Sequence, residues 1–237
     1  MRGFAKVYAF TLKRQTERKG YRAALIIVAL CCFLLPALLV RLFPTMDLTQ
    51  LNLVVYCVGA AYMLLTQWRF LRRDFDPLCD RPGWILVNIC VCYGAMLLFN
   101  MALVGLLSLM VDTANNPNNA AIMDMAGTDA GKVSALAVFL APFVEELIFR
   151  GAVFGSLRHR SRILAYVVSI LLFSAYHVWG FALNDPTIWI YVLQYVPVSY
   201  LLCRCYERTD TIWGSIFFHM LVNAISLRAL TLLQELM

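Results

Sequence analysis

The sequence has little charge. Only 14% of its 237 residues are Asp, Glu, Lys or Arg, whereas 62% are hydrophobic; in soluble domains about a quarter of the residues are charged. Because the apolar residues gather in long runs, this balance excludes an ordinary soluble domain and predicts a membrane protein with several spans. No stretch is long or polar enough to form a separate soluble domain.

Signals for metal sites, internal repeats and signal cleavage are also scarce. The chain has three histidines and eight cysteines, and the cysteines lack the CxxC spacing of a zinc site. They are expected to be buried thiols, although acylation or metal contact at Cys203-x-Cys205 stays open. No internal repeat is apparent, which argues against a transporter built from two similar halves. No small-residue cleavage site follows the first apolar run, so this run is expected to remain as an anchor.

Seven apolar segments predict an all-α, polytopic membrane bundle with about seven transmembrane helices. They cover 23–42, 51–69, 84–111, 133–157, 163–182, 188–203 and 211–233. We expect a single transmembrane domain over 23–237. A basic segment, 1–22, precedes it and is expected in the cytoplasm or on the membrane surface.

The basic residues predict the orientation of these helices. Sixteen of the twenty Lys and Arg lie in the N-terminal segment, in the loops 70–83, 158–162 and 204–210, or at their edges. Because cytoplasmic loops are enriched in Lys and Arg, the N-terminus is expected in the cytoplasm and the C-terminus outside. The net charge of +6 therefore reflects a multi-pass protein in a lipid bilayer and not nucleic-acid binding.

Polar residues inside the apolar segments mark a candidate site. Charged groups within a bilayer cost about 2.5 kcal/mol or more, so they commonly have a function. Counted from the basic ends of their spans, Glu145, His177 and His219 lie within roughly 9 Å of depth, which permits one site in the middle or cytoplasmic half of the membrane. The residues of the candidate site are Glu145, Glu146, Arg150, His177, His219 and Asn223.

Helical spacing suggests roles for five of these residues. Glu146 precedes Arg150 by four residues and can pair with it, whereas Glu145 points about 100° away and has no local partner. A buried carboxylate of this kind is suited to act as a general base. His219 and Asn223 are also four residues apart and can offer two donors to a developing oxyanion. Structural bonding between helices is the alternative for the histidines and the asparagine.

Three ordered motifs resemble the CAAX protease and bacteriocin-processing family, also called the Abi or type II CAAX prenyl endopeptidase family. They are Glu145-Glu146-x-x-x-Arg150, Phe173-x-x-x-His177 and His219-x-x-x-Asn223, and the likeness covers about 130–230, the expected catalytic core. The resemblance implies a glutamic-type intramembrane endopeptidase that needs no cofactor. Bacterial members are linked to bacteriocin self-immunity, peptide processing and membrane-protein turnover, which implies a membrane-associated peptide or protein as substrate.

The same resemblance implies a role for each motif residue. Glu145 and His177 would activate a water, and His219 with Asn223 would form the oxyanion hole. Glu146 and Arg150 would orient the site.

Three other functions stay open at this point. A zinc-dependent protease would use the two histidines and a carboxylate as ligands, although no His-Glu-x-x-His pair is present. A non-catalytic bacteriocin-immunity or scaffolding protein would keep the fold without needing Glu145. A proton-coupled transporter would also use buried acids and histidines.

Overall fold

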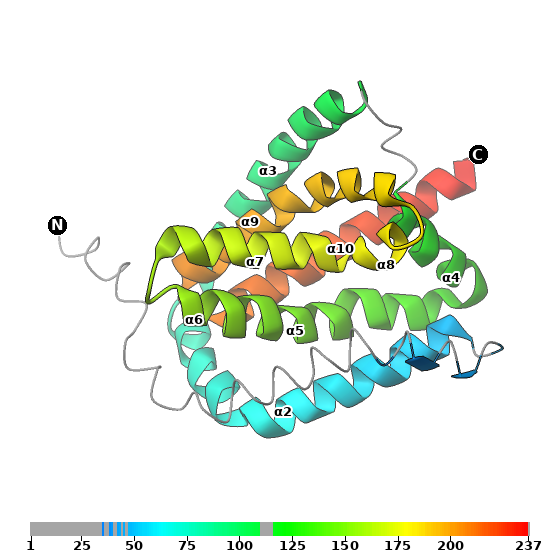
Figure 1. Cartoon of the computed structure of the whole chain (residues 1–237). Coiled ribbons are helices and arrows are strands. Elements are labelled where there is room, and N and C mark those ends of the chain that lie inside the picture. The colour runs from blue at the N-terminus through cyan, green and yellow to red at the C-terminus, as the bar shows by residue number, and fades with distance from the viewer. Residues whose placement is uncertain are drawn as a thin grey trace.

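The computed structural model describes residues 47–109 and 116–236, together with a few isolated positions between 35 and 45. All regular secondary structure in these residues is helical (Figure 1). The predicted all-α fold is therefore confirmed for this part of the chain. The N-terminal segment 1–22 and the first predicted span, 23–42, lie outside the two continuous ranges.

Among the described residues, four helices are long and apolar enough to cross a bilayer: Thr49–Asp80, Pro82–Leu107, Pro186–Thr209 and Ile212–Leu232. Arg162–Tyr176 is a shorter apolar helix. The full elements are α2 (Leu48–Asp80), α3 (Pro82–Leu107), α7 (Arg162–Tyr176), η6 (Pro186–Tyr191), α9 (Val192–Thr209) and α10 (Ile212–Leu236).

Two predicted loops are largely wrong, because the helices run through them. Most of 70–83 belongs to α2, and most of 204–210 belongs to α9. Only corners remain, at Arg81 and at Asp210, where a φ of 54° ends α9. Polar and charged residues extend both helices beyond their apolar runs, so hydropathy alone places the ends too early.

Between the predicted spans 84–111 and 133–157, the Asn116-Pro117 pair is typical of a turn, but residues 117–132 form most of α4 (Pro117–Ser134). The Asn116 side chain caps this helix by accepting hydrogen bonds from the backbone N–H groups of Asn118 and Asn119. Pro117 occupies the first helical turn, where its missing N–H is not needed. The Asn-Pro pair that suggested a turn therefore starts a helix.

The predicted span 133–157 is helical but alternates between α and π geometry. The π segments η4 (Ala135–Leu140) and η5 (Leu147–Phe154) flank α5 (Ala141–Glu146), and α6 (Gly155–Leu157) completes it. The backbone N–H of Ala141 bonds to the carbonyl of Leu136, five residues back. Pro142 has no N–H to continue this register, which leaves the Ala137 carbonyl for another donor. Such π segments are frequent at functional sites.

The predicted span 163–182 is interrupted. Helix α7 ends at Tyr176, His177 is its C-cap residue, and the short helix α8 (Trp179–Ala182) follows. His177 therefore lies at a helix end and not inside a span. There the backbone turns, which frees the side chain to point into the bundle.

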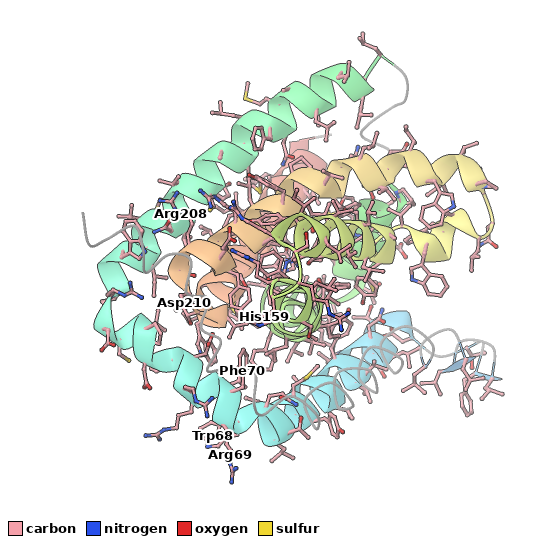
Figure 2. All side chains as sticks on the ribbon, turned by 60° about the vertical axis from the view of Figure 1, so that its left-hand side comes forward. Trp68, Arg69, Phe70, His159, Arg208 and Asp210 are labelled. Carbon is pink, nitrogen blue, oxygen red and sulfur yellow. The ribbon has the colours of Figure 1, made fainter. Side chains whose placement is uncertain are left out.

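The two ends of the bundle differ. The corners at Arg81, 158–161 and Asp210 lie at one end, on the left of Figure 1. Figure 2 looks toward this end, where the labelled Arg69, His159 and Arg208 lie; we call it the basic end. Helices α4 and α8 and the C-terminal half of α10 lie at the opposite end.

Candidate active site

A fully buried ion pair forms the centre of the site. Arg150 Nη1 donates to Glu146 Oε1 over 2.9 Å, as the four-residue spacing predicts. Arg150 Nη2 donates to the carbonyl and the hydroxyl of Ser199 on α9, over 3.1 and 3.0 Å. The guanidinium also lies 4.3 Å from the centre of the Phe173 ring. The pair therefore fixes η5 against α7 and α9.

His219 is oriented by the same carboxylate. Its Nδ1 lies 2.9 Å from Glu146 Oε1 and must donate, because a carboxylate only accepts. The other ring nitrogen, Nε2, then faces Glu145, whose Oε2 is 4.0 Å away. Glu146 thus determines both the tautomer and the direction of this ring.

His177 is oriented by the backbone of α7. Its Nδ1 lies 2.8 Å from the Phe173 carbonyl, which can only accept, so a neutral ring carries its hydrogen on Nδ1 and leaves Nε2 as the acceptor. Nε2 faces Glu145 Oε2 at 3.9 Å. The rings of Phe173 and Tyr195 both pack against the imidazole, each with a centroid separation of 4.5 Å.

Glu145 is held more loosely than Glu146. Its Oε1 accepts one hydrogen bond, from the Tyr56 hydroxyl over 3.3 Å, and this hydroxyl also pairs with that of Tyr176. Its Oε2 faces the two imidazoles at 3.9 and 4.0 Å. Both separations are too long for direct hydrogen bonds and are of the length that one shared water bridges.

Asn223 has a structural contact in addition to its expected role. Its Nδ2 donates to the Ala137 carbonyl over 2.8 Å, which is the carbonyl that Pro142 leaves without its π-helical partner. One amide hydrogen thus stabilises η4. A carboxamide has a second donor hydrogen, which can serve the site.

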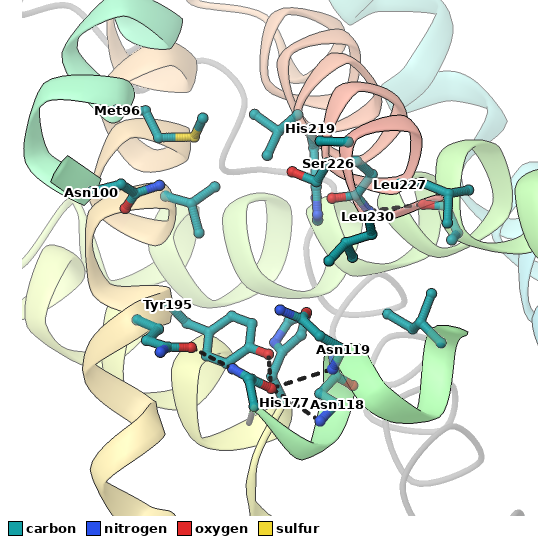
Figure 3. Close-up of a pocket in the computed structure, with 18 of the residues that line it drawn as sticks. Met96, Asn100, Asn118, Asn119, His177, Tyr195, His219, Ser226, Leu227 and Leu230 are labelled. Carbon is teal, nitrogen blue, oxygen red and sulfur yellow. Dashed lines mark hydrogen bonds between the residues drawn. The ribbon is translucent and has the colours of Figure 1, made fainter. Parts of the chain in front are cut away.

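A cavity of about 530 Å³ leads to the site, and His177, His219 and Asn223 line it (Figure 3). Glu145 is not among the described lining residues and lies behind the two imidazoles. The structure therefore brings together every residue of the three motifs, with the imidazoles and the asparagine facing the cavity.

Sequence reasoning missed two contacts of the motif residues. Tyr56 reaches Glu145 from α2, and Ser199 reaches Arg150 from α9. Tyr56 and Ser199 lie in long helices that contain other polar residues, and neither has a fixed spacing to the motifs. Their polarity within a span was the only available signal.

Among the described residues, no group of three or more His, Cys, Asp or Glu side chains is arranged to hold a metal ion. The nearest donor set is Glu145, His177 and His219, with O···N separations of 3.9 and 4.0 Å. Tetrahedral zinc ligands lie about 2.0–2.2 Å from the ion and hence about 3.3 Å from one another. A zinc ion would require this set to contract.

The fold and the site define a helical membrane protein with a buried acid–imidazole centre. Residues 132–225 match the family model described as "Type II CAAX prenyl endopeptidase Rce1-like". The matched part contains all three motifs, so the match confirms the resemblance drawn from them.

Two relatives come from Lactococcus lactis. The chain is 31% identical to the UPF0177 protein YxdF over 94 residues, which are 40% of this chain and 48% of the relative. It is 32% identical to the UPF0177 protein YbdI over 90 residues, which are 37% of this chain and 42% of the relative. The matches thus span less than half the length of these relatives. No solved structure matches the chain.

Proposed function

We propose that the protein is a glutamic-type intramembrane endopeptidase that hydrolyses peptide bonds in a membrane-associated peptide or protein. The carrying observation is the convergence of Glu145 Oε2 with the Nε2 atoms of His177 and His219, at 3.9 and 4.0 Å. The endopeptidase family of residues 132–225 supports the same reaction.

In this mechanism one water lies among these three atoms. Glu145, assisted by His177 Nε2, takes a proton as the water oxygen attacks the scissile carbonyl carbon. The C–O bond forms, the carbonyl oxygen becomes negatively charged, and the C–N bond then breaks. The proton passes to the leaving nitrogen, so the products are a carboxyl group and an amine.

His219 and Asn223 are proposed to stabilise the negative oxygen, because both face the cavity from α10. His219 can donate from Nε2 when both ring nitrogens carry hydrogen. The Glu146 carboxylate at Nδ1 stabilises that charged form, as the acid does in Ser-His-Asp triads. Glu146 and Arg150 act as positioning residues behind this group.

The membrane setting is part of the proposal. Four long apolar helices support a multi-pass protein in the cell membrane. The arginines at one end of the bundle support the seven-span topology with a cytoplasmic N-terminus. Processing of a bacteriocin or a similar membrane-associated peptide is consistent with this setting and requires neither a cofactor nor nucleic acid.

The test is a comparison of peptide termini in membranes and culture medium from cells that carry either the native chain or Glu145→Gln at equal abundance. We expect new termini only with the native chain. Identical termini, together with an immunity phenotype that Glu145→Gln retains, would contradict the proposal and favour the non-catalytic immunity or scaffolding role.

A further inference from the structure

The cavity that leads to the site, here called the chamber, is lined by apolar side chains and by polar side chains that are mostly neutral amides. Among the described residues that line it there is no Asp, Glu, Lys or Arg. Its polar lining consists mainly of carboxamide side chains, with apolar side chains between them. The carboxamides are Asn100, Asn116, Asn118, Asn119, Gln194 and Asn223.

Such a lining is suited to a polypeptide backbone. A carboxamide has a carbonyl acceptor and an N–H donor, the same two groups that a peptide bond presents. A charged side chain in the chamber would lose hydration without meeting an opposite charge. The apolar lining, which includes Met96, Leu103 and Leu227, accommodates uncharged side chains.

Part of this lining is held in place by its own hydrogen bonds (Figure 3). Asn116 Nδ2 donates to Gln194 Oε1 over 2.6 Å, and Asn116 Oδ1 accepts from the Tyr195 hydroxyl over 3.2 Å. These bonds join the start of α4 to α9. Because Tyr195 stacks on His177, the wall and the site are one connected structure.

The chamber is closed at the site and open at the end of the bundle opposite the basic end. On α3, the lining residues change from Met96, 4% exposed, to Val104, 42% exposed. On α10, the lining changes in the same direction from the buried His219 to the exposed Ser226. Both helices run away from the basic end, so the mouth lies at their C-terminal halves.

The arginines indicate which side of the membrane this mouth faces. Those at the basic end are Arg69, Arg72, Arg73, Arg81, Arg158, Arg160, Arg162, Arg204 and Arg208. By the positive-inside rule, the basic end is cytoplasmic. The mouth then faces outward, whereas the sequence suggested a site reached in the middle or cytoplasmic half.

From these observations we propose that the chamber accepts an extended, uncharged polypeptide segment that enters from the non-cytoplasmic side. The inference rests on the proposed peptidase function. Such a segment belongs either to a peptide already exported or to the outer flank of a membrane-anchored protein. In both cases the partly exposed carboxamides of Asn100, Asn118 and Asn119 bind its backbone, and the site cleaves where the backbone passes the two histidines.

The first test measures the direction of the mouth and does not depend on activity. Ser226→Cys places a thiol at the mouth, and Arg160→Cys places one at an exposed position of the basic end. Intact cells are treated with a membrane-impermeant maleimide, and each labelled site is located by peptide mass spectrometry, which separates it from the native cysteines. We expect labelling of Ser226→Cys in intact cells and of Arg160→Cys only after permeabilisation. The reverse pattern would overturn the proposal.

The second test measures the charge of the substrate segment. Asn100→Asp and Asn100→Lys place opposite charges in the chamber wall, away from the reacting groups. We expect both to reduce the native-dependent peptide termini at least tenfold, because an uncharged segment gains from neither charge. If one variant keeps the native-dependent termini and the other loses them, the substrate segment is charged and the proposal is wrong. The proposal is also wrong if both variants keep these termini.

Matched controls separate these outcomes from misfolding and from failure of the proposed function. Ser226→Cys labelling in each Asn100 variant reports an intact chamber, and the same pair of substitutions at Asn119 on α4 repeats the test on another wall.

The proteins in which new termini appear distinguish the two sources of the segment, secreted peptides and anchored proteins. New termini within cytoplasmic segments would overturn the proposal. If cells with the native chain and cells with Glu145→Gln yield the same peptide termini, the peptidase function is refuted. The labelling experiment would still report the direction of the mouth.

Discussion

Two buried carboxylates, Glu207 at the basic end and Glu145 in the site, have opposite surroundings. Their exposed fractions are alike, 4% and 6%. Glu207 accepts hydrogen bonds from Arg158 over 2.8 Å, from Arg162 over 3.0 and 2.8 Å, and from Tyr166 over 2.9 Å. Among the described residues, Glu145 accepts one, from the neutral hydroxyl of Tyr56 over 3.3 Å.

The difference separates a carboxylate that holds structure from one that can react. Both oxygens of Glu207 are occupied by close donors from α7 and from the corner before it, so its lone pairs are not available to a substrate. The other oxygen of Glu145, Oε2, faces the two imidazoles and is available to the water proposed to lie among them. A poorly paired buried polar group costs about 1–3 kcal/mol, and proteins keep such groups mainly at functional sites.

The largest expected effect concerns Glu145. Glu145→Gln removes the general base but keeps the side-chain shape and an acceptor for Tyr56, so we expect hydrolysis of an identified substrate to fall about 10²–10⁴-fold. The melting temperature in detergent should hardly change. A variant that retains more than a tenth of the native rate would rule out this role.

The next effect concerns the central ion pair. Arg150→Met removes the permanently charged partner of the buried Glu146 and leaves only the imidazole of His219 beside it, so the free energy of unfolding should fall by about 3–5 kcal/mol. Denaturant unfolding in detergent measures this loss. The double variant Glu146→Gln, Arg150→Met removes both charges and should recover part of the stability. Equal stability of the single and double variants would argue against an uncompensated charge as the cause.

A smaller and different effect is expected at the basic end. Glu207→Gln weakens hydrogen bonds from charged donors, each worth about 1.5–3 kcal/mol, and should lower stability by a comparable amount. Activity per folded molecule should stay close to native, because Glu207 lies away from the chamber. A large loss of specific activity at unchanged stability would break the distinction between the two carboxylates.

The smallest effect is expected at Tyr56. Tyr56→Phe removes the hydrogen bond to Glu145, worth about 1 kcal/mol, which corresponds to roughly a fivefold lower kcat. KM should be unchanged, because Tyr56 acts through Glu145 and does not touch the substrate. Tyr176→Phe is the matched comparison, since the Tyr176 hydroxyl pairs with that of Tyr56. An equal loss of kcat in both variants would indicate that the tyrosines act through packing and that the Tyr56 hydroxyl does not position Glu145.

Features that depend on local spacing could be predicted from the sequence. The apolar runs gave the helical membrane fold, and the four-residue spacing gave the Glu146–Arg150 pair. Helix ends could not be predicted in the same way, because α2 and α9 continue through charged residues once tertiary contacts stabilise them. The π segment η4 lies just before Pro142, where a proline commonly kinks a helix, and no local pattern predicts the π geometry there or in η5.

Contacts between distant segments were also beyond the sequence. Tyr56 lies 89 residues from Glu145 in the chain, and only the packing of α2 against α5 brings them together. The proposed direction of the chamber follows from where its lining on α3 and α10 becomes exposed. Hydropathy gives the depth of a residue in the membrane, but it does not show which side a buried site opens to.

The most direct test of the account compares peptide termini from cells with the native chain, Glu145→Gln or Glu207→Gln, each normalised to the amount of folded protein. We predict that the native-dependent termini disappear with Glu145→Gln and persist with Glu207→Gln. Loss of the termini to the same extent in both variants, or in neither, would contradict the claim that the loosely held carboxylate performs the chemistry.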